Sequence, residues 1–288
     1  MTPADPFARR RWPTSLRLSA GVHAAALVTL ALAPRSWPLV LGTLALDHAV
    51  LTAGGLWPRS RLLGPNLDRL PPPAEACGEV ALTFDDGPNP EVTPRVLDLL
   101  DRYAARATFF CIGRRVECHP RLVGEIAARG HGVENHSHRH RNGFALLGPR
   151  RMAAEIDGAQ EAIAGATGRR PAFFRPPAGF RNPWLEPLLA RREMLLVSWT
   201  RRGYDTFDRD PDRVLGRLLG GLRGGDLLML HDHNLVRPRK EVVLEVLPRL
   251  LAALHSRGLR SVALRQEHGA RYLDEGPLSR DERVRGAG

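Results

Sequence analysis

Two long apolar runs precede any alternating pattern in this chain of 288 residues. The first extends from Leu18 to Ala33 and the second from Trp37 to Trp57, and a proline follows each run. A helix needs roughly 20 mostly apolar residues to cross a bilayer core, and both runs approach that length. The pattern predicts a transmembrane or membrane-inserted helical hairpin over residues 18–58. A cleavable signal peptide is the rival interpretation, but no cleavage site is evident and a second apolar run follows at once.

Polar side chains interrupt the predicted hairpin at His23, Asp47 and His48. A charge in the middle of a membrane helix is costly in free energy. Either Asp47 therefore has a partner within the hairpin, or the second helix lies at a shallow depth in the membrane.

Arginines flank the hairpin unevenly. Only Arg35 stands in the predicted turn, whereas a basic N-terminal segment, residues 1–17, and the stretch after the hairpin carry the others: Arg9, Arg10, Arg11, Arg17, Arg59, Arg61 and Arg69. Because basic flanks stay on the cytoplasmic side, the domain after the hairpin is predicted to lie at the cytoplasmic face of the inner membrane. A single membrane anchor would instead place that domain on the extracytoplasmic side.

After the hairpin the pattern changes. Residues 59–77, which include three consecutive prolines, are expected to form a semi-rigid linker. Short apolar runs beyond Gly78 predict strands at Glu79–Phe84, Ala107–Ile112, Gly132–Asn135, Ala172–Phe174, Met194–Trp199, Asp226–His231 and Arg260–Leu264. The amphipathic stretches between them predict helices at Pro90–Ala104, Pro120–Arg129, Pro149–Ala164, Pro183–Arg192, Pro211–Leu222 and Pro238–Ser256.

Strands that alternate with helices in this way favour a parallel sheet, closed or nearly closed into a barrel. The predicted fold class is thus α/β, with one domain over residues 78–265. An open doubly wound sheet is the alternative, although no Gly-rich phosphate loop follows the first strand. The charged, Gly-rich tail, residues 266–288, is expected to fray.

The net charge of +11 comes almost wholly from arginine, because Lys240 is the only lysine. These arginines are spread along the chain and aromatic residues are only 6% of it, so nucleic-acid binding is not indicated. Attraction to an anionic membrane surface is the simpler use of the charge. The three cysteines, Cys77, Cys111 and Cys118, give no disulfide framework, although one bridge from Cys118 to either of the others stays open.

Two adjacent carboxylates end the first predicted strand. Asp85 and Asp86 follow an apolar run and precede a Gly-Pro turn. In parallel barrels, catalytic groups project from the carboxyl ends of the strands. Because adjacent like charges repel, the pair requires a metal ion or an arginine beside it, unless it only caps the next helix.

Histidines follow the third predicted strand. His136 and His140 are four residues apart, a spacing that puts two imidazoles on one side of a helical turn. With one carboxylate they form a His-His-Asp set suited to zinc or another borderline divalent ion. A His-rich loop alone is more often a solvated surface, and His131 and His138 are expected to be peripheral.

Two later strand ends carry single candidate residues. Arg175 precedes two prolines that restrict the backbone, so its guanidinium could be fixed to orient a carboxylate. His231 emerges at the end of an apolar strand, the position expected of a general acid. Taken separately, the first could be only a rigid loop and the second a structural histidine.

Together these segments resemble the NodB-type polysaccharide deacetylases, also called carbohydrate esterase family 4. Four motifs, within residues 79–264, carry the resemblance in the family's order: Thr83–Pro88, His136–His140, Arg175–Gly179 and Leu228–His231. The resemblance implies a distorted (β/α) barrel that removes an acyl group from a sugar with the help of a divalent metal. It further implies Asp86, His136 and His140 as metal ligands, Asp85 as general base, Arg175 as its orienting residue, His231 as general acid and the amide of Ala178 as oxyanion donor.

The sequence departs from the family pattern at two places. Ala178 stands where the family usually has tyrosine, so the backbone donor can remain but the ring is absent. In the segment Trp199–Thr206, only Asp205 remains as a carboxylate to tune His231, and Thr206 replaces a common aromatic groove wall. The catalytic core is thus retained, while the walls that hold a long polymer are altered.

Three functions follow as hypotheses. The first is a membrane-attached hydrolase that uses Zn²⁺, Co²⁺ or another transition metal to remove an acetyl or formyl group from an amino sugar in a glycan or lipid-linked saccharide. The second is an extracytoplasmic deacetylase of peptidoglycan or exopolysaccharide. The third is an inactive glycan-binding or scaffold protein on the same fold. The sequence indicates no other cofactor and identifies no protein partner.

Overall fold

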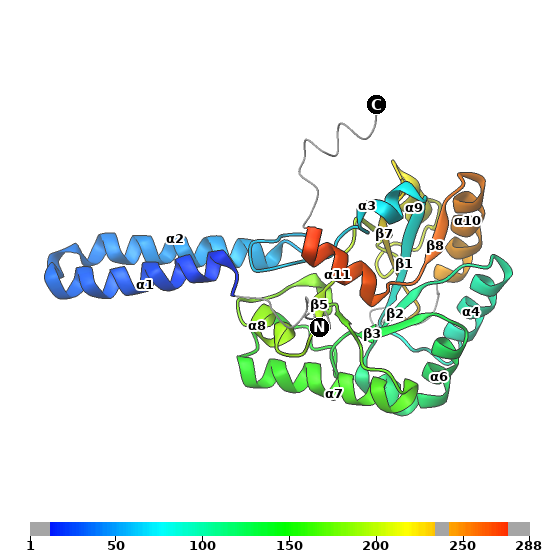
Figure 1. Cartoon of the computed structure of the whole chain (residues 1–288), viewed down its shortest axis with the longest axis horizontal. Coiled ribbons are helices and arrows are strands. Elements are labelled where there is room, and N and C mark those ends of the chain that lie inside the picture. The colour runs from blue at the N-terminus through cyan, green and yellow to red at the C-terminus, as the bar shows by residue number, and fades with distance from the viewer. Residues whose placement is uncertain (1–11, 234–241, 276–288) are drawn as a thin grey trace, which may run out of the picture.

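The computed structural model describes residues 12–233 and 242–275 of the chain. Two long helices, α1 (Thr14–Leu32) and α2 (Trp37–Leu56), lie side by side and are joined by a short 3-10 turn, η1 (Pro34–Ser36). They project away from the remaining body of the protein as a hairpin (Figure 1). Both helices are long and apolar enough to cross a membrane, judged by length and composition. Helix α1 begins at Thr14, before the expected Leu18, and includes Arg17 in its first turn.

Asp47 has a partner inside the hairpin. The Ser19 hydroxyl of α1 donates a hydrogen bond of 2.7 Å to the Asp47 carboxylate of α2, and His23 Nδ1 lies 3.9 Å from the same carboxylate oxygen. The rings of His23 and His48 meet edge to face. Of the two explanations for a charge within this segment, the structure supports a polar cluster between the helices.

Residues 59–77 pack against the body of the protein and differ from the expected linker. Leu63, Leu67 and Leu70 are buried, and Leu67 forms a bridge with Val197 beside the sheet. A short helix, α3 (Pro72–Ala76), contacts the first strand. The three leucines were missed because prolines and charged residues separate them in the sequence.

A parallel sheet forms the centre of the body. Its order is β5-β4-β3-β2-β1-β7-β6, and β8 pairs with the first residues of β1 on the side of β2, opposite to β7. The strands are β1 (Glu79–Asp85), β2 (Thr108–Cys111), β3 (Gly132–Asn135), β4 (Phe173–Phe174), β5 (Leu195–Leu196), β6 (Arg201–Arg202), β7 (Leu227–His231) and β8 (Arg260–Val262). The sheet curls into a distorted barrel, which confirms the expected fold class.

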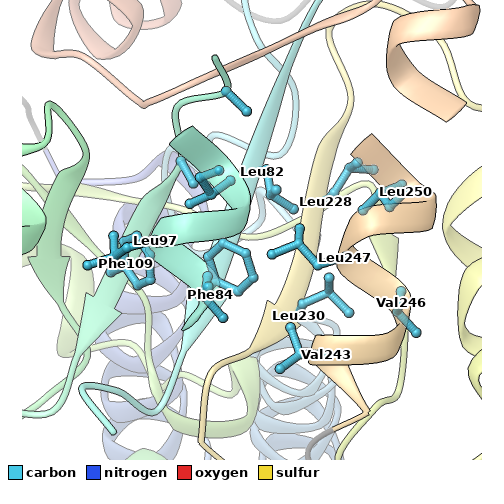
Figure 2. Packing of buried hydrophobic residues seen from close by; sticks show 14 of the residues in the cluster. Leu82, Phe84, Leu97, Phe109, Leu228, Leu230, Val243, Val246, Leu247 and Leu250 are labelled. Carbon is cyan, nitrogen blue, oxygen red and sulfur yellow. The ribbon is translucent and has the colours of Figure 1, made fainter. Parts of the chain in front are cut away.

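Helices surround the sheet (Figure 1), most of them on its outer face, whereas the last one packs its Tyr272 with residues of the inner face. They are α4 (Thr93–Arg102), α5 (Gly113–Cys118), α6 (Pro120–Ala128), α7 (Pro149–Thr167), α8 (Leu185–Ala190), α9 (Pro211–Leu219), α10 (Val243–Ser256) and α11 (Gln266–Glu275). Figure 2 shows how α10 packs its Val243, Val246 and Leu247 toward β7 and β1. The expected start of this helix at Pro238 lies outside the described residues.

Two elements differ from the sequence expectation for clear physical reasons. Strand β6 was missed because it consists of two arginines; Arg201 is paired with the buried Asp226, and Arg202 lies against Trp199 and Tyr204. Residues 266–275, expected to fray, form α11, because Tyr272 is buried and its hydroxyl accepts a hydrogen bond from the Asn66 amide.

The register of the sheet determines which side chains meet. Asp85 of β1 is opposite His231 of β7 on one side and Phe110 of β2 on the other. Asn135 of β3 is opposite Phe174 of β4, the residue before Arg175. All of these positions are at the carboxyl ends of parallel strands, so the loops that follow them converge at one end of the barrel.

Candidate active site

The two carboxylates at the end of β1 point to different neighbours. Asp85 is 3% exposed and Asp86 is 5% exposed, so both are removed from bulk water. Asp86 has a φ of 73°, in the left-handed region, which turns its side chain away from the line of the strand. The two adjacent residues therefore reach different partners although both leave the same strand end.

Asp86 faces the two histidines that follow β3. Its Oδ1 lies 3.4 Å from His136 Nε2 and 3.1 Å from His140 Nε2. One ligand atom from each of the three residues lies within 4.8 Å of the others. The structure thus brings together the three residues that the sequence predicted as metal ligands, while His131 and His138 lie outside this group.

The hydrogen bonds around this group leave its ligand atoms free. His136 Nδ1 bonds the Arg175 carbonyl oxygen at 2.7 Å, which fixes the proton on Nδ1 and leaves Nε2 as a lone-pair donor toward Asp86. Asp86 Oδ1 is buried without a hydrogen-bond partner in the described part of the chain. Burial lowers the pKa of His140 to about 4, so its imidazole is neutral at physiological pH, the form that binds metal.

Arg175 holds the other carboxylate. It is fully buried, and its Nη1 donates to Asp85 Oδ1 at 2.6 Å and to the Thr83 hydroxyl at 2.9 Å. Its remaining nitrogens donate to the carbonyl oxygens of Val197 and Ser198, and its guanidinium lies 4.0 Å from the centre of the Phe110 ring. Asp85 is consequently held against a fixed cation and has its other oxygen, Oδ2, 3.9 Å from His136 Nε2.

His231 lies at the end of β7, on the side of β1 opposite to β2, and is paired with Asp205. Asp205 accepts two hydrogen bonds, one from His231 Nδ1 at 2.9 Å and one from the His231 amide at 2.7 Å. Burial alone would lower the pKa of His231, but the charge and hydrogen bond of Asp205 outweigh it and raise that pKa to about 9. His231 is therefore protonated at neutral pH and keeps Nε2 free to donate a proton.

The loop after Arg175 contains the remaining predicted residue. Ala178, within the short turn η3 (Pro177–Gly179), has a φ of 56°. Gly179 is required next to it, because a Cβ at this position would collide with the Trp199 ring and would press on Pro58 at the end of the hairpin. Thr206, where the family has an aromatic wall, is buried beside Asp205 and offers no broad surface to a ligand.

Sequence reasoning missed Asp232, the residue after His231. Its carboxylate is fully buried and accepts a hydrogen bond from Thr93, and burial raises its pKa to about 7. A Cβ on Gly87 would collide with this carboxylate, so Asp232 packs against the turn that follows Asp86. The His-Asp-His sequence at 231–233 was a signal for this contact, but only its first residue was used.

Comparison with known proteins identifies relatives by sequence. A family model described as polysaccharide deacetylase matches residues 74–193. A peptidoglycan-N-acetylglucosamine deacetylase from Bacillus cereus is 32% identical, over 64% of this chain and 85% of the relative. A chitooligosaccharide deacetylase from Sinorhizobium fredii is also 32% identical, over 70% of this chain and 97% of the relative.

A solved structure agrees with the sequence matches. The family 4 carbohydrate esterase from Streptomyces lividans superimposes with a TM-score of 0.60 at 33% identity, covering 67% of this chain and 95% of that one. A barrel with these strand ends, matched over nearly the whole length of two deacetylases, defines the class. The chain belongs to the polysaccharide deacetylase family.

Proposed function

We propose that this protein is a metal-dependent carbohydrate deacetylase that removes an N-acetyl or N-formyl group from an amino sugar at a membrane. The observation that carries the proposal is the meeting of Asp86, His136 and His140 beside a second, separately held carboxylate, Asp85. Membership in a family whose matched relatives are named as deacetylases of peptidoglycan N-acetylglucosamine and of chitooligosaccharide supports the reaction.

The three proposed ligands fit a divalent cation. A buried carboxylate oxygen without a hydrogen bond, facing two imidazole nitrogens, is a donor set that zinc or cobalt would complete. Such an ion supplies Lewis-acid chemistry, lowering the pKa of water and polarising an amide carbonyl. The choice between these metals is part of the proposal, and Zn²⁺ is the first candidate because its tetrahedral preference suits three ligands and one open position.

Asp85 is assigned as the general base. Its Oδ1 is held by Arg175, while Oδ2 is directed toward the proposed ligands, so it can accept a proton from a water molecule attacking the amide carbon. The rigid pair with Arg175 keeps the carboxylate in one orientation. The amide of Ala178 is assigned as the donor to the developing oxyanion.

His231 is assigned as the general acid that protonates the departing amine. It is buried, faces the same strand end as Asp85, and is kept protonated by Asp205. With the base at the end of β1 and the acid at the end of the neighbouring strand β7, a proton can be removed from water and another delivered to the sugar nitrogen. Acetate release from an N-acetylated oligosaccharide by the purified, metal-loaded protein tests the proposal.

The role of Asp205 predicts a change in pH dependence. His231 must be protonated to act as an acid, so activity falls as the pH rises through its pKa. Asp205→Asn removes the charge that raises this pKa, so the alkaline limb of kcat/KM should move to lower pH by about 1–3 units. The exposed Asp212→Asn is the matched control and should leave the limb in place. An unshifted limb in Asp205→Asn would exclude His231 as the acid.

A lipid-linked saccharide is the proposed substrate form. The apolar hairpin supports a membrane location, and the absence of aromatic residues at positions 178 and 206 supports a site with less wall for a long polymer. The arginines on both sides of the hairpin support a cytoplasmic orientation of the catalytic domain. A second candidate is an extracytoplasmic peptidoglycan deacetylase, which the names of the relatives favour. An inactive scaffold is disfavoured because every assigned position is filled.

Native cysteines offer a test of the orientation. Cys77 and Cys118 are free and exposed on the catalytic domain. In spheroplasts, a membrane-impermeant maleimide should leave both unlabelled until the cells are lysed. The matched control, Ser36→Cys in a chain with Cys77→Ser and Cys118→Ser, places a thiol in the hairpin turn and should be labelled in intact spheroplasts. Labelling of Cys77 or Cys118 before lysis would support the peptidoglycan candidate instead.

A further inference from the structure

A cavity of about 560 Å³ lies where the hairpin joins the catalytic domain. Its walls come from both sides of this junction: Leu16 and Ala20 of α1, Thr52 and Leu56 of α2, and Leu146 and Trp184 of the catalytic domain. The volume is in the range of ordinary ligand sites. This cavity is distinct from the deacetylase site, since it includes none of the residues assigned to catalysis.

The cavity runs along the hairpin toward the membrane. His23 and His48, which belong to the polar cluster with Asp47, also line it. On α1 the lining residues extend from Leu16 to His23, seven residues further on, which is roughly 10 Å at 1.5 Å per helical residue. Among the residues that line it, Trp12 and Trp184 are 52% and 48% exposed, and Leu146 is 90% exposed. Exposed tryptophans of this kind favour the interface between lipid and water.

The loops that line the cavity are continuous with the catalytic loops. Ala145 is five residues after His140, which limits their separation to at most about 18 Å of extended chain. Asn182 is four residues after Ala178, and its side chain donates to the carbonyl oxygens of Ala145 and Leu147 at 2.9 and 3.0 Å. The hairpin is tied to the same loop, because the Arg181 amide donates to the Gly55 carbonyl oxygen at 3.1 Å.

Arg181 adds a positive charge to the cavity wall. It is 4% exposed, and its Nε is buried without a hydrogen-bond partner among the described residues. The charge of Glu186 acts on it from nearby. A buried guanidinium with one unused donor, set between an apolar cavity and the catalytic loops, is suited to an anionic group that joins a sugar to a lipid.

We infer that this cavity binds the hydrocarbon chain of the lipid-linked amino sugar, with the phosphate link of that substrate near Arg181 and the sugar directed to the catalytic loops. The inference rests on the proposed function and identifies how the substrate class is recognised. The chain enters sideways from the bilayer between α1 and the loop that carries Leu146 and Trp184. The substrate is thereby selected by its lipid as well as by its acyl group.

Filling the cavity tests the inference. Ala20→Trp places an indole among the lining residues, whereas Ala25→Trp, five residues on, lies about 140° around the same helix and is the matched control. Two probes are compared in detergent micelles: N-acetylglucosamine joined by diphosphate to a long isoprenoid chain, and a soluble N-acetylglucosamine oligosaccharide. The ratio of kcat/KM for the lipid probe to that for the soluble probe should fall about tenfold or more in Ala20→Trp. Displacing only two methylene groups of the hydrocarbon chain from the cavity loses enough binding free energy for a change of that size.

A second readout needs no catalysis. An isoprenoid phosphate with a photoreactive group in its chain should label the segments around Leu146 and Trp184 in the wild type and in Ala25→Trp, and should label them much less in Ala20→Trp. Equal labelling in the two variants, or an unchanged kcat/KM ratio in Ala20→Trp, overturns the inference. If the wild type hydrolyses neither probe, the proposed function fails, and the labelling alone still decides whether the cavity holds a lipid chain.

Discussion

Asp85→Asn should lower kcat/KM by about 10²- to 10⁴-fold, the usual contribution of a general acid or base, while the bound metal is retained. Asparagine keeps the shape of the side chain and an oxygen for Arg175, but it cannot accept a proton from water. Because Asp85 is not among the proposed ligands, metal content measured on the purified variant should match that of the wild type.

The neighbouring residue provides the matched comparison. Asp86→Asn changes the same functional group one position later, but it replaces the carboxylate that faces His136 and His140. This variant should lose both metal and activity. If Asp85→Asn lost the metal as well, or kept its activity, the division of roles between the two carboxylates would be wrong.

Arg175→Met should destabilise the fold by about 3–5 kcal/mol, because it leaves the buried Asp85 carboxylate without its counter-charge. The guanidinium also makes hydrogen bonds to Thr83, Val197 and Ser198, none of which methionine can replace. Urea unfolding of the purified domain measures the loss. The variant should also lose activity, since Asp85 is no longer held in one orientation.

Two further variants separate the charge effect from simple loss of packing. Arg249→Met removes an arginine from an exposed ion pair with Asp212 and should change the unfolding free energy little. The double variant Arg175→Met with Asp85→Asn should be more stable than Arg175→Met alone, because no unpaired carboxylate remains. A double variant that is less stable than the single one would show that the ion pair is not the source of the effect.

The ends of the central strands could be predicted because buried parallel strands have a strong local signal. Each is a short apolar run that stops at polar residues, and parallel strands present those ends on one side. The sequence alone therefore predicts that Asp85, His136 and His231 meet. The partners that hold them could not be predicted in the same way. Ser198, whose carbonyl oxygen holds Arg175, reaches the site through packing that has no local pattern.

The segments that were wrongly predicted share one property. Residues 59–77 and 266–275 bury a few apolar side chains, such as Leu67 and Tyr272, among prolines and charges. Local composition then resembles a linker or a tail, although long-range contacts order the chain. The cavity between the hairpin and the catalytic loops was equally hidden, because its walls come from four separate parts of the sequence.

The central claim is that Asp86, His136 and His140 bind a divalent ion needed for amide hydrolysis. The most direct measurement removes metal from the purified protein with a chelator, titrates Zn²⁺ back, and follows bound metal and acetate released from an N-acetylated oligosaccharide together. Acetate release should disappear in the stripped protein and return in proportion to metal, with a plateau at one ion per chain. Full release from metal-free protein, or no release at full metal occupancy, would contradict the account.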